Sequence, residues 1–318
     1  MSSAHLHPVK TFWTGFAAVA AVTLLGSLSA TAQQAPDPVT LWSQATLYRD
    51  EWGVPHVYAE NARALGFAFG YAQAEDRIES LLLAYRMANG RLAAVLGPAY
   101  AESDAFSVKM NHARLAQAAL EQIDPVTREL CEGFALGINS WIIDHPGVAP
   151  AWADGAQAQD VLALWHAFLM SFAPFDAPGT WHRPPAMETG NAWAMAPSRT
   201  AEGKAILVIN PHEHFDGPFQ WCEAHLAMGD MDVSGAALCG VPVIAMGHNA
   251  ALGWALTPNF PDFADVYNEH FATPPPGETP KDQDKNGELP IPTGMVALLE
   301  YMAQAQPYYV RTDAGMEE

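Results

Sequence analysis

Glu188-Thr189-Gly190-Asn191-Ala192-Trp193-Ala194-Met195 separates two kinds of sequence. Before it, apolar side chains recur at helical spacing, and after it short β-branched runs alternate with turn residues, which predicts strands. We therefore divide the chain here, into a helix-rich region of residues 33–186 and a strand-rich region of residues 187–318.

Outward from this stretch, the expected elements follow in order. Helices are predicted over about residues 62–96, with a bend at Gly90, over 108–122, from Pro125 after the capping residue Asp124, and over 160–172. A hairpin precedes them, with strand-like residues 39–42 and 46–50, a turn, and a strand over 56–59. Strands are expected later at residues 192–195, 205–209, 219–226, 232–237, 243–247, 253–256 and 308–312. Helices followed by short strands predict an α+β fold with antiparallel sheets.

Composition excludes several classes of function. The chain has 318 residues, half of them hydrophobic and 16% charged, so it can form a large core and is not a disordered tail. The formal charge of −20 argues against nucleic acid or anionic lipid as a partner, because their phosphates would be repelled.

The N-terminus has the features of an export signal. Lys10 is followed by an apolar run from Phe12 to Leu25, and Ala30-Thr31-Ala32 fits a small-residue cleavage site. A signal peptide over residues 1–32 predicts a periplasmic or secreted protein. The chain has three cysteines, Cys131, Cys222 and Cys239. Export would permit one disulfide, for which Cys222–Cys239 is a candidate pair, but the spacing does not require it. We expect structural thiols.

Several blocks of sequence, in the same order, resemble the penicillin amidase family. They are Arg49-Asp50-x-x-Gly53-Val-Pro55-His56-Val-Tyr-Ala59, Gly70-Tyr-Ala-Gln73-Ala-Glu75-Asp76-Arg77, Gly90-Arg-Leu, Gly137-Ile-Asn139, Asn191-x-Trp193, Asn210-Pro-His212 and Gly247-His248-Asn249 with Trp254-Ala-Leu-Thr257. The resemblance implies a four-layer αββα N-terminal-nucleophile hydrolase fold, made from two chains cut from one precursor. It also implies hydrolysis of an amide in a penicillin, a cephalosporin or an acyl-homoserine lactone.

In that family a serine at the start of the second chain is the nucleophile, and its own α-amino group is the base. Asn191-x-Trp193 places Gly190 at the position of this serine. The same register places His212 beside the nucleophile and Thr257-Pro258 where the family supplies an oxyanion-stabilising backbone N–H. Glycine has no hydroxyl and Pro258 has no N–H, so both functions depart from the family's pattern.

The resemblance also implies a calcium site. Asp262, Ala264 and Asp265 fall where the family takes two carboxylates and one backbone carbonyl, and hard oxygen ligands suit Ca²⁺. A solvated acidic loop is the alternative. His212 and His214, with His225 nearby, raise a zinc hypothesis, but no third ligand has a recognised spacing.

Other residues have two interpretations each. Thr189 could replace the missing serine if cleavage followed Glu188, or it could be an ordinary loop residue. Arg49, Asp50, Asp76 and Arg77 could form a catalytic set, but buried ion pairs that fix the hairpin to the first helix are the preferred explanation. Trp193, Tyr71 and Tyr85 are expected in the core.

Three functions remain open from the sequence. The chain is an exported acylase that acts on an acylated small molecule, a catalytically inactive member of the family that binds such ligands or a partner, or a truncated relic. The family's second oxyanion donor, an asparagine, lies beyond any position that corresponds to residue 318. A missing C-terminal portion of the same precursor is therefore an expected partner.

Overall fold

The computed structural model describes residues 37–172, 190–213, 215–257, 310–312 and 315–317. Its helices are α1 Pro38–Trp42, α2 Ala62–Ala88, α3 Ala93–Leu96, α4 Ala101–Lys109, α5 His112–Leu120, α6 Pro125–Asp144 and α7 Ala158–Met170, with short 3₁₀ turns η1 Pro98–Tyr100 and η2 Pro197–Arg199. Its strands are β1 Ala45–Arg49, β2 Pro55–Ala59, β3 Gly190–Met195, β4 Ile206–Pro211, β5 Trp221–Met228, β6 Met231–Leu238, β7 Ile244–His248, β8 Gly253–Trp254, β9 Val310–Thr312 and β10 Gly315–Glu317.

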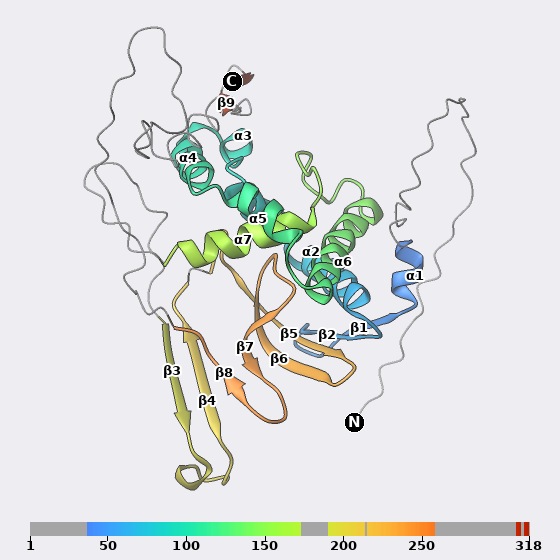
Figure 1. Cartoon of the computed structure of the whole chain (residues 1–318), viewed down its shortest axis with the longest axis vertical. Coiled ribbons are helices and arrows are strands. Elements are labelled where there is room, and N and C mark those ends of the chain that lie inside the picture. The colour runs from blue at the N-terminus through green and yellow to red at the C-terminus, as the bar shows by residue number, and fades with distance from the viewer. Residues whose placement is uncertain (1–36, 173–189, 214, 258–309, 313–314, 318) are drawn as a thin grey trace, which may run out of the picture. The chain divides into compact units, whose positions relative to one another are not determined.

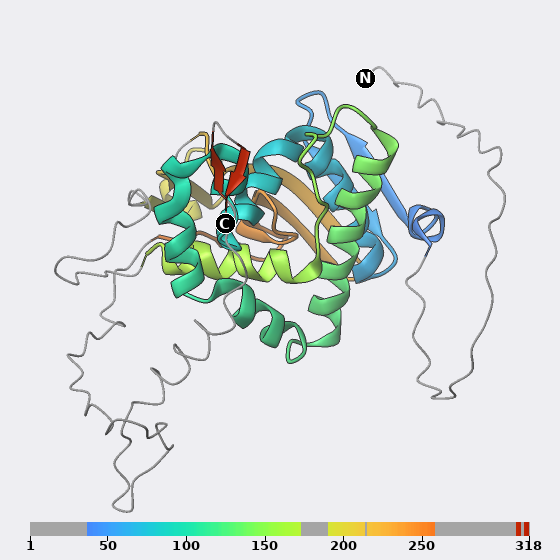
Figure 2. The ribbon, with the colours of Figure 1, turned by 90° about the horizontal axis from the view of Figure 1, so that it is seen from above.

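The main sheet combines strands from both sides of residue 190. Its order is β1-β2-β5-β6-β7-β8, and every pairing is antiparallel except β2 with β5. Helices α2, α6 and α7 lie over one face of this sheet (Figures 1 and 2). The α+β class predicted from the sequence is therefore seen directly, and the helix-rich and strand-rich regions share one sheet.

The core lies between that sheet face and the helices. Val57 of β2, Leu226 of β5 and Leu238 of β6 are buried with Leu81 of α2 and Phe134 of α6. Helix α2 crosses α6 at unusually close range, through Gly66 and Gly70 on one helix and Gly133 and Gly137 on the other. A Cβ at any of these four positions would overlap backbone atoms of the opposite helix. The close crossing therefore requires the absence of side chains.

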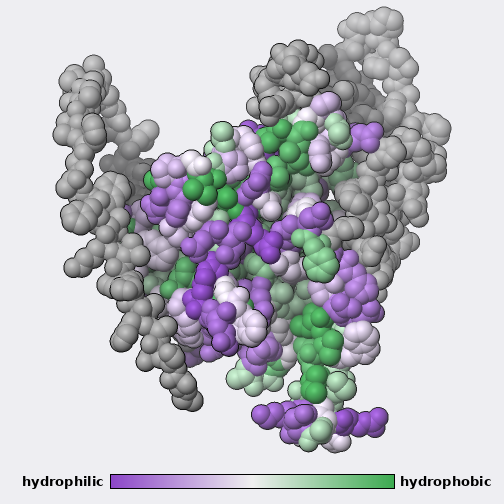
Figure 3. All heavy atoms as spheres, turned by 180° about the vertical axis from the view of Figure 1, so that it is seen from behind, coloured by the Kyte–Doolittle hydropathy of each residue, from purple (hydrophilic) through white to green (hydrophobic). Residues whose placement is uncertain are grey.

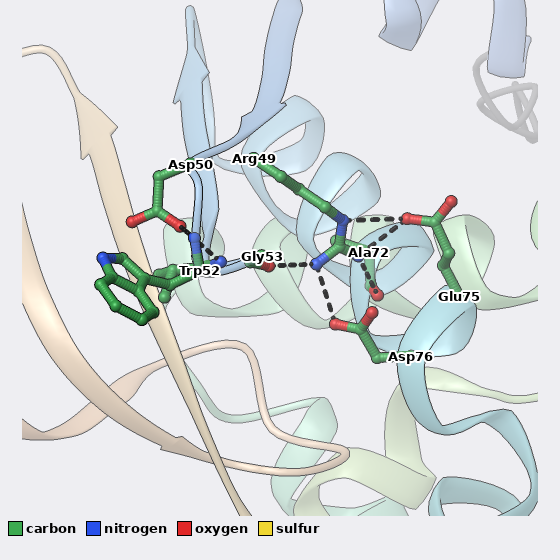
Figure 4. Close-up of polar contacts among 8 residues, drawn as sticks. Arg49, Asp50, Trp52, Gly53, Ala72, Glu75 and Asp76 are labelled. Atoms are coloured by element: carbon green, nitrogen blue, oxygen red, sulfur yellow. Dashed lines mark hydrogen bonds and ion pairs between the residues drawn. The ribbon is translucent and has the colours of Figure 1, made fainter.

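An arginine fixes the first hairpin to α2 (Figure 4). The Arg49 guanidinium donates to the carboxylates of Glu75 and Asp76 and to the backbone carbonyls of Gly53 and Ala72. The predicted ion pair between hairpin and helix is confirmed for Arg49 and Asp76. Its predicted burial is wrong, since the side chains of Glu75 and Asp76 are 49% and 44% exposed.

Asp50 and Arg77, the other two residues predicted to fix the hairpin to the first helix, form different contacts. Asp50 accepts the backbone N–H groups of Trp52 and Val54 inside the turn. Arg77 donates to the side chain of Gln220 at the start of β5, from a non-helical position inside α2. Neither residue forms an ion pair between the hairpin and α2.

Several predicted elements are corrected by the structure. Residues 39–42 belong to helix α1 and not to a strand, because Asp37 caps the first turn and Pro38 occupies its first position. The helix expected over 108–122 is two helices, since Asn111 adopts a left-handed conformation with φ 58°. The helix expected over residues 62–96 with a bend at Gly90 ends at Ala88, Gly90 follows it at φ 64°, and residues 93–96 form the separate helix α3.

Aromatic burial is also only partly as predicted. Tyr85 lies in the core, where its hydroxyl donates to the Gly240 carbonyl, and Tyr71 packs at the core's edge. The prediction for Trp193 is wrong, since 54% of its surface is exposed. Among the described residues, strand β3 pairs only with β4.

Candidate active site

Gly190 lies at one end of a two-stranded ribbon. Strands β3 and β4 pair antiparallel, with Gly190 opposite Pro211 and Asn191 opposite Asn210. The connecting turn uses Gly203 at φ 65°. Because β4 ends at Pro211, this register brings the next residue, His212, to the end of the ribbon that carries Gly190.

Two asparagines hold the imidazole of His212. Its Nε2 atom lies 3.0 Å from the amide nitrogen of Asn191 and 3.1 Å from that of Asn210. An amide nitrogen donates, so Nε2 accepts from both and the ring proton of the neutral imidazole resides on Nδ1. Sequence reasoning missed this role of the asparagines, although both stand inside the quoted blocks around Trp193 and His212.

The described atoms around Gly190 leave room for a Cβ. A Cβ built on Gly190 would lie 3.5 Å from the Asn210 carbonyl oxygen, 3.7 Å from the Pro211 Cα and 3.8 Å from the Leu256 carbonyl oxygen. These are ordinary van der Waals distances. The Leu256 contact also brings the segment that follows β8 beside Gly190, two residues before Pro258.

Most of the other predicted site residues lie outside the described residues. This applies to Thr189, Pro258, Asp262, Ala264 and Asp265. His214 is outside them too, and His225 bonds His56 and Asp232 and not His212. Within the described ranges, no group of three or more His, Cys, Asp or Glu side chains could hold a metal ion.

The three cysteines are free thiols, of which Cys131 and Cys239 are buried and Cys222 is partly buried. Cys131, Cys222 and Cys239 are all free, so the candidate Cys222–Cys239 disulfide is wrong and the expectation of structural thiols is confirmed. Cys222 donates instead to the Ala237 carbonyl on β6. Burial raises the pKa of Cys131 and of Cys239 to about 12, which keeps both protonated and poorly reactive.

Comparison with known families agrees with this geometry. Residues 44–289, more than half of the chain, match the penicillin amidase family. The chain belongs to the penicillin amidase family. The N-terminal-nucleophile hydrolase fold implied by the sequence blocks is thereby confirmed.

Curated relatives in this family are acylases. The chain is 30% identical over 257 residues to an acyl-homoserine lactone acylase of Pseudomonas fluorescens, which covers 67% of this chain and 33% of the relative. It is 23% identical over 313 residues to the penicillin acylase 2 proenzyme of a Pseudomonas species, covering 78% and 39%. An aculeacin-A acylase of Actinoplanes utahensis is 27% identical over 260 residues, covering 67% and 33%. The chain thus spans only a third or slightly more of the length of these relatives.

A solved structure, thermostable penicillin G acylase from Alcaligenes faecalis, is 27% identical, covers 40% of this chain and 72% of that chain, and has a TM-score of 0.37. Among the described residues, no helix is both long and apolar enough to cross a membrane.

Proposed function

We propose that this chain is an acylase-family protein that binds the amide of an acylated small molecule beside Gly190 without hydrolysing it by the family route. The ligand class is a β-lactam or an acyl-homoserine lactone, as in the relatives' names. One observation supports the proposal above the others: His212 and space for a side chain are both present at Gly190, whereas the hydroxyl is not.

The chemistry explains why binding and turnover separate here. In the family route a hydroxyl attacks the scissile carbonyl, and the α-amino group of the same residue takes its proton. Glycine at position 190 supplies no oxygen for either self-cleavage or acyl transfer. Proline at position 258 removes an oxyanion donor, and loss of one such donor costs about 10²–10³ in rate.

Hydrolysis through Thr189 is the alternative function. It requires a cut between Glu188 and Thr189, which would give threonine a free α-amino group. Threonine is chemically competent for this role. A burst of nitroaniline from an acyl-nitroanilide by the purified wild-type chain would establish this alternative in place of the binding function.

Binding without turnover can be measured directly. Equilibrium dialysis with a long-chain N-acyl-homoserine lactone and with penicillin G should show a saturable complex from which each ligand is recovered intact. His212→Ala should weaken the complex, and Lys204→Ala, in the turn at the other end of the ribbon, is the matched control. No saturable binding of either ligand would contradict the proposal, and so would release of the free acid.

We also propose that Asp262, Ala264 and Asp265 bind Ca²⁺, on the basis of their register and oxygen ligands. Chelation by EDTA should then lower the melting temperature, and Asp262→Asn with Asp265→Asn should abolish that difference. Export after cleavage behind Ala32 is proposed from the signal-like N-terminus, and N-terminal sequencing of exported protein should begin at Gln33.

A C-terminal portion of the same precursor is the proposed protein partner, because the aligned part of this chain covers only 33% of the acyl-homoserine lactone acylase. Pull-down of the tagged chain with the corresponding C-terminal two thirds of a relative is a direct check.

A further inference from the structure

Two histidines meet on the sheet face that lies away from the helices. His56 of β2 and His225 of β5 are direct register partners, and their Nδ1 atoms are 3.0 Å apart. Val57 and Leu226, the next residue on each strand, point to the opposite face and lie in the helix-covered core. The acylase site at Gly190 does not use either histidine.

The neighbours of this pair determine where its protons are. The Nε2 atom of His225 lies 2.9 Å from a carboxylate oxygen of Asp232, which can only accept, so this nitrogen carries a proton. A neutral His225 then has a bare Nδ1, which faces two donors: the Nδ1–H of His56 at 3.0 Å and the Tyr58 hydroxyl at 3.4 Å. His56 is therefore left with an unprotonated Nε2.

That atom has no hydrogen-bond partner. The His56 Nε2 is buried and unsatisfied, and a carboxylate oxygen of Asp50 lies 3.6 Å from it. The other carboxylate oxygen of Asp50 is engaged by the turn that Figure 4 shows. Two acceptors thus face one another, and one proton between them would satisfy both.

We propose that Asp50, His56, His225 and Asp232 form a proton-operated clasp between the first hairpin and β5–β6, which closes with one bound proton and opens with two. The first proton enters at His56 Nε2 and makes an ion pair with Asp50. A second proton can enter only at His225 Nδ1, which places two N–H groups against each other. The repulsion between these N–H groups breaks the side-chain link between β2 and β5, the one parallel pairing among the described strands of the main sheet.

Other polar groups share this face with the two histidines. Tyr48 stacks on His56 at 4.9 Å between ring centroids, and its hydroxyl lies 3.3 Å from that of Tyr58. This contact with Tyr48 raises the pKa of Tyr58, so its hydroxyl stays protonated. By strand alternation, Glu223 of β5 and His248 of β7 share the face, and His248 stands opposite Ser234, the register partner of His225.

Imidazole nitrogen spectra of ¹⁵N-histidine-labelled wild-type protein test the clasp. At about pH 8 His56 should be the Nδ1–H tautomer and His225 the Nε2–H tautomer, and on acidification the second proton should need at least a tenfold higher proton concentration than the first. Finding Nε2–H on both rings, or simultaneous titration of both, would overturn the proposal.

Two variants separate the clasp from general acid sensitivity. Asp50→Asn keeps an oxygen for the turn but removes the charge, so a several-fold higher proton concentration should be needed to protonate His56. Asp37→Asn, which alters the cap of α1, should leave the His56 titration unchanged. An unchanged His56 titration in Asp50→Asn would also overturn the proposal. In the wild-type chain, amide exchange at Val57–Ala59 should accelerate only when the second proton binds, and no such step would count equally against it.

Discussion

Gly190 stands at a position whose backbone does not require glycine. It is the first residue of a regular strand and is not among the glycines with positive φ. Its neighbours leave normal van der Waals distances for a side chain. Backbone conformation therefore gives no reason for glycine here, in contrast to positions such as Gly235, where a Cβ would overlap the Met246 carbonyl oxygen.

Gly190→Ser should therefore fold as well as the wild-type chain. We expect the free energy of unfolding to change by less than about 1 kcal/mol, because the unfolded chain loses freedom and no contact is lost. Gly235→Ser is the matched control and should be destabilised by about 3 kcal/mol or more. Urea denaturation of the three proteins measures both effects, and a large loss of stability in Gly190→Ser would contradict the described geometry.

A second residue-scale prediction concerns acid stability. His112 is 1% exposed, and its Nδ1 lies 2.7 Å from that of His166. Burial, with a smaller contribution from His166, lowers the pKa of His112 to about 4 from an ordinary 6.5. Below pH 6.5 the unfolded chain binds a proton at this histidine, whereas the folded chain binds it only near pH 4. The free energy of unfolding therefore decreases as the pH falls from 6.5 to about 4, by up to ~3 kcal/mol.

Replacing this histidine should flatten the decline. In His112→Gln, the free energy of unfolding measured by denaturant titration should depend less on pH between 6.5 and 4 than in the wild-type chain. His145→Gln is the control, because the His145 ring bonds Trp141 and takes no part in the pair. An identical slope in His112→Gln and wild type would show that the buried pair does not control acid stability.

At the scale of elements, the α2–α6 crossing depends on four glycines that ordinary propensity would disfavour. Gly137→Ala should raise intrinsic helix stability by about 1 kcal/mol, but its Cβ would overlap the Phe67 carbonyl oxygen. The cost of the overlap should exceed the gain in helix propensity, and we expect the free energy of unfolding to fall by roughly 2 kcal/mol or more. Thermal denaturation checks this against Glu129→Ala on the same helix, and a more stable Gly137→Ala would contradict the close crossing.

Local signals predicted most elements but not their partners. Asp124 and Pro125 mark the start of α6, and Gly90 marks the end of α2, because caps act over a few residues. The same cap rules applied to Asp37-Pro38 would have found α1. The parallel pairing of β2 with β5 joins residues about 170 positions apart, and no local pattern encodes it.

The candidate site shows the same limit. Asn191-x-Trp193 predicted that Gly190 falls at the family's nucleophile position. The contact of Asn191 and Asn210 with His212 could not be predicted in the same way, because it depends on the register of β3 with β4. The apolar residues of this segment predicted burial of Trp193. They did not reveal that β3 pairs with β4 or that Trp193 is exposed there. The ribbon's apolar side chains Trp193, Met195, Ile206 and Val208 remain partly exposed. Figure 3 shows hydrophobic and hydrophilic patches mixed over the face of the molecule seen from behind.

At the scale of the whole molecule, the main sheet holds together segments from both sides of residue 190. Strands β1 and β2 precede the boundary and β5–β8 follow it. A protease site inserted between residues 180 and 186 should therefore yield two pieces that stay associated after cutting. Their co-elution in size-exclusion chromatography is the expected result, and separation without denaturant would contradict a shared sheet and core.

The central claim is that Gly190 occupies the nucleophile position of an acylase-type site and prevents the family's chemistry there. Intact-mass spectrometry of the purified wild-type chain tests it most directly. After removal of the proposed signal peptide, we expect one uncut polypeptide with no new N-terminus at residues 188–190. A cut between Glu188 and Thr189, together with turnover of an acyl-nitroanilide, would contradict the claim.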